Sequence, residues 1–435
     1  MIGRILEATA GRVSAADAAV KSDDTLTLEI SAGGESRLAG SHTRTTYLRA
    51  ILEGRIGGSS TSDDDAAGLA ARAMAAAAAG ERLELFFPAP APLPGVLTRF
   101  PAAAAAGAEA LDALARTLRE DLARDRRRVE VWAERSEGRV EVANTRGVLA
   151  GYDVSLCGIG AVVEQLGPGA GPPCRGHLSG SALPDLPEIE ALVAEIERRL
   201  APPVVDWAGP RPAALPVCFA PRALATFLRP LRAALLGREA WLGRSPLRGK
   251  LGERLFSEGL SITDDPLAPG RPGSRPIDDE GVPSRRITLI ERGRLIGFLS
   301  DLEVGVRANV PSTGHGWRLP GQPPRAGYTN FLVAPGTESP AALLSAMETG
   351  LLVEDLDWGA GPSPLGSGGA VGFRAPWAYL VEGGEVRGRL PGVVLSGNVI
   401  QALGRIRGIG SDATWLGSQC LPSLAVDGMG AAVRP

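Results

Sequence analysis

Residues 270–314 read GRPGSRPIDDEGVPSRRITLIERGRLIGFLSDLEVGVRANVPSTG, and the rest of the chain is interpreted outward from this stretch. It sets three acids in a row, Asp278, Asp279 and Glu280, between proline and glycine residues. Adjacent carboxylates repel one another unless cations or amide groups compensate their charge. We therefore expect the acids to fix a loop or to form a site, with a solvated acidic turn as the alternative.

Alternating apolar residues directly after the acids predict a β-hairpin. Ile287, Leu289 and Leu295 alternate with polar residues on either side of Arg292 and Gly293. A glycine-containing pair between two such runs is typical of a tight hairpin turn.

Composition limits the classes of protein that fit. A chain of 435 residues is too long for one compact core, so two or three domains are expected. The formal net charge of −3 argues against a nucleic-acid surface. The four cysteines form no CxxC pair, which argues against a disulfide framework or a zinc knuckle. No long apolar run and no signal-peptide core are present, so we expect a cytoplasmic protein without a membrane span.

The order of the patterns predicts three domains. Residues 1–100 are predicted as an α/β domain that ends at the proline-rich segment 86–96, with an alanine-rich helix capped at Ser62. Residues 101–215 are predicted as a helix plus an antiparallel meander. In residues 216–435 we expect a helix kinked at Pro230 and some helix between residues 244 and 258.

Most familiar catalytic signatures are missing from the sequence. Its three histidines, His42, His177 and His315, include no pair four residues apart, so the HExxH motif is absent, and no GxSxG elbow exists. Asp278, Asp279, Glu280 and His315 remain as weak catalytic candidates, each with a structural role favoured. Adjacent acids in an extended segment point to opposite faces, so Asp278 and Asp279 are not expected to form an aspartic dyad. Cys420 is interpreted as an inert thiol.

An ordered set of short motifs resembles the TldD/PmbA family, once described as modulators of DNA gyrase. The matching segments are 277–283 (IDDEGVP), 297–301 (GFLSD), 312–314 (STG), 329–330 (TN), 350–353 (GLLV), 372–373 (GF) with 381–385 (VEGGE), 396–398 (SGN) and 418–422 (SQCLP). The resemblance implies an α+β fold, with an N-terminal α/β region of mixed or antiparallel sheet. It also implies a larger C-terminal domain, residues 216–435, of strongly curved, barrel-like antiparallel sheet with flanking helices.

The resemblance also implies a peptidase built from two related subunits. The TldD-type subunit carries a metal on an HExxxH helix completed by a later cysteine, and the PmbA-type (TldE) subunit lacks that motif. Here residues 222–258 contain no histidine, and no cysteine lies between Gly410 and Gly417. The chain therefore resembles the PmbA-type subunit. No metal ligands are expected in it, and zinc is expected only in a TldD-type partner.

The leading hypothesis is a non-metal subunit that pairs with a metal-bearing paralogue as a heterodimer, or with a second copy of itself, and helps to enclose unfolded or precursor peptides. We expect the chamber to be lined by Ser312, Thr313, Gly314, Asn330 and Asn398. One alternative is a peptide-binding scaffold that forms a homodimer without hydrolysis. Another is an autonomous hydrolase that uses the acids at 278–280.

Overall fold

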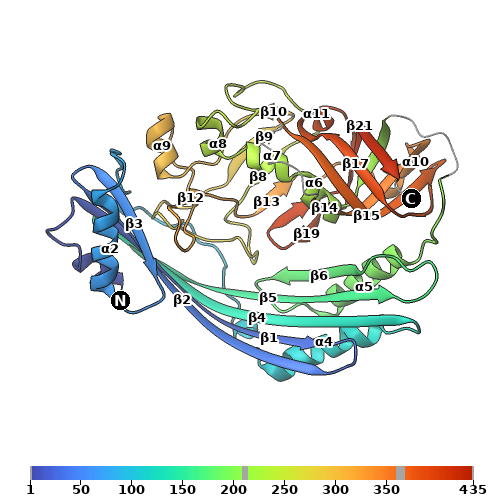
Figure 1. The fold of residues 1–435 in the computed structure, drawn as a ribbon, viewed down its shortest axis with the longest axis horizontal. Helices are drawn as coiled ribbons and strands as arrows, with labels where there is room; N and C mark the ends of the chain where they lie inside the picture. The colour runs from blue at the N-terminus through green and yellow to red at the C-terminus, as the bar shows by residue number, and fades with distance from the viewer. Residues whose placement is uncertain (1, 208–213, 359–367, 434–435) are drawn as a thin grey trace.

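The computed structural model describes residues 2–207, 214–358 and 368–433. The chain forms two lobes, a long curved N-terminal sheet and a C-terminal lobe that packs along one side of it (Figure 1). Both lobes combine strands with flanking helices, so the α+β class is confirmed. No described helix is long and apolar enough to span a membrane.

The N-terminal lobe is built on one six-stranded antiparallel sheet. Its strands, in spatial order, are β3 (Arg55–Thr61), β2 (Ser36–Leu52), β1 (Ala15–Ile30), β4 (Arg127–Asn144), β5 (Leu149–Gln165) and β6 (Cys174–Gly180). Its helices are α1 (Ile2–Glu7), α2 (Ala66–Ala78), α3 (Pro101–Ala104), α4 (Ala108–Leu122) and α5 (Leu186–Leu200).

Side chains alternate along β1 and separate the two faces of this sheet. Ala16, Ala18 and Val20 pack against α1 and α2 in one hydrophobic cluster. Asp17 and Lys21 point to the opposite face, where they contact the C-terminal lobe. Helices therefore cover one face of the sheet, and the second lobe covers part of the other.

The predicted domain boundary at residue 100 does not divide this sheet. β1 comes from the first predicted domain and pairs along 14 residues with β4 from the second, from Asp17 opposite Asn144 to Ile30 opposite Val131. The proline-rich segment is an extended connection between α2 and α3. It was expected to end the first domain, but it runs along the sheet that both predicted domains share. Proline blocks regular pairing within this segment, but it does not separate the strands on either side of it.

The C-terminal lobe contains a closed, strongly curved sheet. A ring is formed in the order β14 (Thr349–Trp358), β7 (Leu215–Phe219), β21 (Leu424–Val433), β17 (Val393–Asn398) and β15 (Ala370–Glu382), which pairs back to β14. β16 (Glu385–Leu390) extends it from β15, and β18 (Ile406–Ile409) pairs with β21. The barrel-like domain is confirmed, with one difference from the antiparallel expectation: β7 and β14 pair in parallel.

A second sheet links this barrel to the acidic run. It has the order β10 (Arg294–Leu295), β9 (Ile287–Glu291), β8 (Ile262–Asp264), β13 (Phe331–Val333), β20 (Gln419–Leu421) and β19 (Thr414–Leu416), with a separate ribbon of β11 (Gly316–Trp317) and β12 (Arg325–Ala326). The helices of this lobe are α6 (Pro221–Phe227), α7 (Arg229–Ala234), α8 (Gly237–Trp241), α9 (Leu302–Ala308), α10 (Pro340–Ser345) and α11 (Val399–Leu403).

Several local predictions can be compared directly with these elements. The hairpin is confirmed as β9–β10, with positive φ at both turn residues, Arg292 and Gly293. The predicted kink is a break between α6 and α7, because Pro230 lies in the first turn of α7. The cap predicted at Ser62 is wrong, since Asp65 caps α2 by accepting from the Gly68 amide. The helix expected within residues 244–258 is also wrong, because this segment contains turns and an isolated β-bridge at Arg254 and no helix.

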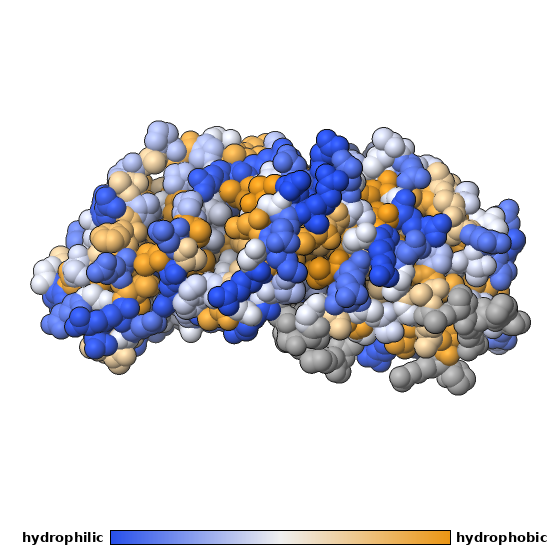
Figure 2. Space-filling view, turned by 90° about the horizontal axis from the view of Figure 1, so that it is seen from above, coloured by the Kyte–Doolittle hydropathy of each residue, from blue (hydrophilic) through white to orange (hydrophobic). Residues whose placement is uncertain are grey.

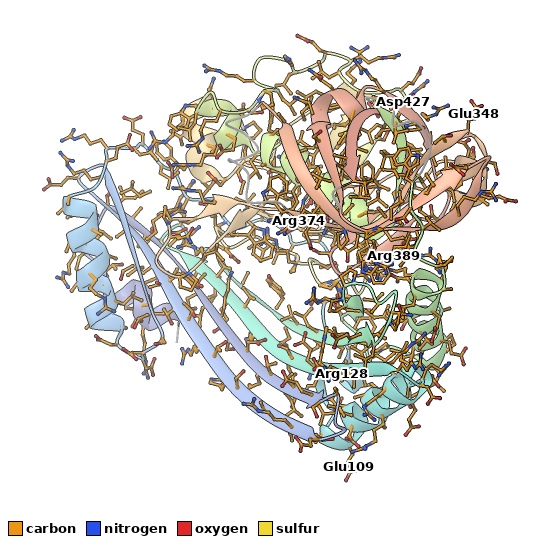
Figure 3. All side chains as sticks on the ribbon, turned by 45° about the vertical axis from the view of Figure 1, so that its right-hand side comes forward. Glu109, Arg128, Glu348, Arg374, Arg389 and Asp427 are labelled. Carbon is orange, nitrogen blue, oxygen red and sulfur yellow. The ribbon has the colours of Figure 1, made fainter. Side chains whose placement is uncertain are left out.

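The lobes also meet away from the acidic run. Arg199 of α5 and Arg389 of β16 lie over the ring of Trp377, at 5.5 and 5.3 Å from its centroid. Figure 3 shows Arg389 where the C-terminal lobe meets the N-terminal one, and Arg128 out on the sheet. The two lobes are therefore joined at more than one place.

Candidate functional site

The acidic run lies between the two lobes and is buried. Asp278, Asp279 and Glu280 expose at most 1% of their surface. A solvated acidic turn is therefore excluded, and the expectation of a fixed loop is confirmed.

Asp278 organises its own loop. Its Oδ1 accepts from the backbone amides of Glu280 and Val282 at 3.0 and 2.8 Å, and its Oδ2 accepts from the Gly316 amide at 2.8 Å. Gly281 has a φ of +85°, which favours glycine at this turn. Burial raises the pKa of Asp278, although Arg275 and the three amides oppose the shift.

Asp279 and Glu280 instead reach beyond the loop. Asp279 Oδ2 lies 2.5 Å from Nζ of Lys21 and accepts from the Arg318 amide at 2.7 Å. Glu280 Oε1 accepts from Nη1 of Arg49 at 2.7 Å, and its Oε2 accepts from the Leu302 amide at 2.8 Å. Because Asp278 and Asp279 bind different partners, they do not form a carboxylate dyad.

Asp17 completes what we call the interlobe ion cluster: Asp17, Lys21, Arg49, Asp279, Glu280 and Arg318. Nε and Nη2 of Arg49 donate to the two oxygens of Asp17 at 2.9 and 2.6 Å, and Nη2 of Arg318 also donates to Asp17. Three cations thus balance three carboxylates from both lobes. The cluster joins β1 and β2 to the acidic loop.

The members of the cluster differ in how firmly they hold their charge. Burial raises the pKa of Asp17, but Arg318 and Arg49 outweigh burial, so the net pKa lies below its usual value. Burial raises the pKa of Glu280 to about 7, helped by Asp278 and Asp301 and opposed by Arg49. Glu280 is therefore the member expected to change charge near neutral pH.

This difference predicts the effect of Glu280→Gln on stability. Folded Glu280 keeps its proton up to about pH 7, whereas the unfolded chain loses it near its ordinary value of 4.5. The wild type therefore loses stability through this group as pH rises from about 4.5 to about 7. Glutamine does not titrate, and Arg49 still holds both oxygens of Asp17. Urea unfolding from pH 5 to pH 8 should show the variant gaining stability relative to wild type as pH rises.

The exposed residue Glu190 offers a matched control. Glu190→Gln should follow the wild-type profile across the same pH range. If Glu280→Gln also runs parallel to wild type, the assignment of Glu280 as the titrating member is wrong.

His315 is fully buried, and both of its ring nitrogens are engaged. Nδ1 lies 2.9 Å from the carbonyl oxygen of Thr313, and Nε2 lies 3.1 Å from Oδ1 of Asp264. Both partners are oxygen atoms of the chain itself, so neither ring nitrogen is directed to an open site. The geometry therefore favours a structural role over the catalytic candidacy.

The small residues before His315, at positions 312–314, contact the backbone of nearby segments. Thr313 Oγ1 donates to the Ser300 carbonyl at 2.9 Å and accepts from its amide at 3.0 Å, and Ser312 Oγ lies 3.3 Å from the same carbonyl. Gly314 has a φ of +76°, and a Cβ there would lie 2.7 Å from the carbonyl oxygen of Pro283. Ser312 and Thr313 therefore bind the segment just before α9, and Gly314 packs against the loop before β9.

The two asparagines lie in other places. Oδ1 of Asn330 accepts from the Gly273 amide at 3.1 Å, and its Nδ2 donates to the Asp265 carbonyl at 2.7 Å. Asn398 caps α11 by accepting from the Gln401 amide at 3.1 Å. The residues expected to line one chamber are thus distributed over separate loops, each with backbone partners.

Several residues of the site were not predicted from the sequence. Asp17, Arg49 and Arg318 were not singled out, nor was Asp264. A signal was present in two cases, because Asp17 interrupts AADAAV and Arg49 interrupts YLRAIL. A lone charge within an apolar strand is seldom buried without a partner.

The described residues do not fit a metal centre. In residues 2–207, 214–358 and 368–433, no group of three or more His, Cys, Asp or Glu side chains could hold a metal ion. His42 is exposed beside Asp24, and His177 lies beside Arg222. Burial raises the pKa of the Cys420 thiol, which agrees with the prediction that it is unreactive.

A groove of about 470 Å³ lies beside the cluster. Its floor is formed by β2 and by Ile56–Ser60 of β3, and its other wall includes Glu303, Arg318 and residues 321–324. β3 lies at one edge of the N-terminal sheet, and Arg55 at its start bridges to Arg82.

Comparison with known proteins agrees with this architecture. The profile of the PmbA/TldA metallopeptidase C-terminal domain matches residues 212–433. A metalloprotease of Methanothermobacter thermautotrophicus is 32% identical over 171 residues, which cover 39% of this chain and only 37% of that protein. Metalloprotease PmbA of Escherichia coli O157:H7 is 27% identical over 296 residues, 66% of this chain and 61% of that protein.

The fold is shared over nearly the whole chain with a solved structure. TldE from Thermococcus kodakarensis superposes with a TM-score of 0.84 at 21% identity, covering 99% of this chain and 98% of that one. With a family profile that spans half of its length and this barrel, the chain belongs to the TldD/PmbA family.

Proposed function

We propose that this chain is the non-metal subunit of a TldD/PmbA-type peptidase, which pairs with a metal-bearing paralogue and helps to hold an extended peptide for cleavage. The observation that supports this proposal most directly is the kind of side chain that α6 and α7 place inward. Their inward residues, Ala223, Leu224, Phe227 and Leu231, are apolar and fully buried. These helices supply core side chains where a zinc site would need imidazole or carboxylate ligands.

The acids at 278–280 already have ionic or hydrogen-bonding partners within the chain, which favours this proposal over an autonomous hydrolase. Peptide hydrolysis needs an activated water or nucleophile. Asp279 and Glu280 are paired with cations, and the oxygens of Asp278 accept backbone amides. These acids are at most 1% exposed, and their partners within the chain occupy the groups that would have to activate a water.

A partly apolar surface on the C-terminal lobe supports pairing with another subunit. Six large hydrophobic side chains between residues 242 and 319 are exposed: Leu242, Leu251, Ile296, Val306, Val310 and Leu319. Seen from above, hydrophobic residues gather near the middle of the molecule between hydrophilic ones (Figure 2). Exposed apolar side chains rimmed by polar ones are typical of protein interfaces.

Co-expression with a paralogue that carries HExxxH tests the proposal. Cleavage of an unfolded peptide is expected only when both chains are present, and zinc only in the paralogue. Leu251→Asp should weaken co-purification. Leu149→Asp, at an exposed position on β5 of the N-terminal lobe, should not. Stoichiometric zinc or cleavage in this chain alone would reject the proposal. Peptide binding without cleavage in every combination would favour the homodimeric scaffold.

A further inference from the structure

Arg275 is a buried cation that forms no ion pair with any residue the structure describes. Only 1% of its surface is exposed, and its guanidinium lies over the Trp317 ring, 3.9 Å from the centroid. Nη1 makes a long contact of 3.4 Å with the Gly316 carbonyl. Nε and Nη2 have no hydrogen-bond partner among the described residues. Leaving such donors unpaired in the interior is costly.

The two unpartnered nitrogens form the edge of the guanidinium that binds carboxylates side-on. Elsewhere in the chain, Nε and Nη2 of Arg49 hold the two oxygens of Asp17. Nε and Nη2 of Arg244 hold the two oxygens of Glu239, both at 2.7 Å. Such paired contacts are strong and specific for a planar anion. In Arg275 this edge meets no carboxylate in the described part of the chain.

Arg275 lines a small pocket between the lobes that is rich in donors. The pocket has a volume of about 150 Å³ and is also lined by Tyr152, Arg271 and Trp317. The edge of the Trp317 ring that carries Nε1 lies against Gly327, so this ring contributes its face and not its donor to the pocket. Burial raises the pKa of the Tyr152 phenol, so its hydroxyl stays protonated and able to donate.

The neighbouring acids do not satisfy these donors. Asp279 also lines the pocket, but it is paired with Lys21 and accepts from the Arg318 amide. Asp278 acts on Arg275 only through space, because its oxygens accept from backbone amides.

We propose that this pocket binds a carboxylate, held side-on by Nε and Nη2 of Arg275, with the Tyr152 hydroxyl as a further donor. The volume of about 150 Å³ admits one carboxylate with a short substituent. The carboxylate belongs either to a small free acid or to the last residue of a peptide. The site is a property of this chain alone and does not depend on pairing with a metal-bearing subunit.

Calorimetric titration of the purified full chain tests the site with acetate, N-acetyl-Ala-Ala and N-acetyl-Ala-Ala-amide. At least one of the two acids should bind saturably, and the amide should bind at least about tenfold more weakly than N-acetyl-Ala-Ala if the latter is the ligand. Arg275→Lys keeps the charge but removes the paired donors, so affinity should fall by about tenfold or more. Tyr152→Phe should weaken binding several-fold.

The controls separate loss of the site from loss of the fold. Arg286→Lys alters an exposed arginine in the loop after the acids and should leave binding unchanged. Thermal unfolding identifies any variant that fails to fold, and Tyr152→Phe removes only a hydroxyl. Binding of acetate as tight as that of N-acetyl-Ala-Ala assigns the site to small acids, and preference for the peptide acid assigns it to a peptide C-terminus. Equal binding of inorganic phosphate, equal affinity in Arg275→Lys, or no saturable acid binding would overturn the proposal.

Discussion

Asp17→Asn is expected to lower the free energy of unfolding by about 3–5 kcal/mol. Asp17 is the carboxylate shared by Arg49 and Arg318, whose side chains are 4% and 3% exposed. Asparagine leaves both guanidiniums buried without their common counter-ion, and Arg318 has no other carboxylate within ion-pair distance among the described residues. Chemical denaturation measures the loss, and limited proteolysis should show faster cleavage where the lobes meet.

An exposed ion pair provides the control for Asp17→Asn. Asp153 pairs with Arg139, and both side chains are about half exposed. Asp153→Asn should cost no more than about 1 kcal/mol, because solvent screens such pairs. The pKa of Asp17 is lowered in the folded chain, so its contribution is present above its ordinary value of 3.8 and is lost as pH falls below it. A loss below about 1 kcal/mol for Asp17→Asn would show that the cluster does not hold the lobes.

Phe227→Ala is expected to cost about 3–5 kcal/mol. Phe227 lies on α6, has no exposed surface and stacks on Phe219 with ring centroids 4.2 Å apart. Its ring also lies 6.0 Å from that of Phe373 on β15. Alanine leaves a cavity where the helix packs on the closed sheet, and the transition in urea should move to a lower concentration with little change in slope.

A surface phenylalanine serves as the control for this change. Phe86 is 72% exposed, so Phe86→Ala should change stability by no more than about 0.5 kcal/mol. If Phe227→Ala were similarly mild, α6 would not be a core helix. The argument that its inward face supplies packing in place of metal ligands would then lose its basis.

The sequence predicts the parts of this fold that depend on neighbours in the chain. The hairpin at 287–295 and the break before Pro230 each rest on contacts within a few residues. The barrel was predicted from the family resemblance, which carries information that local patterns lack. The proline-rich segment suggested a boundary that the sheet does not have, because local composition does not show which strands pair on either side of it.

For the same reason, only part of the candidate site could be predicted from the sequence. The acidic run stands out in the sequence, but the partners that explain it lie far away along the chain. Asp17 and Arg318 are 301 residues apart, and Arg49 and Glu280 are 231 apart. Which lone charge meets which other depends on how the two lobes dock. No spacing rule encodes that docking.

The place of β21 in the ring has a consequence for how the molecule is made. β21 lies between β7 and β17, and β7 is separated from it by nearly the whole C-terminal lobe in sequence. A nascent chain therefore cannot complete its barrel until residue 433 has left the ribosome. Until then the aromatic interior around Phe219 is open to water and to other chains, a condition that favours aggregation and calls for chaperone protection.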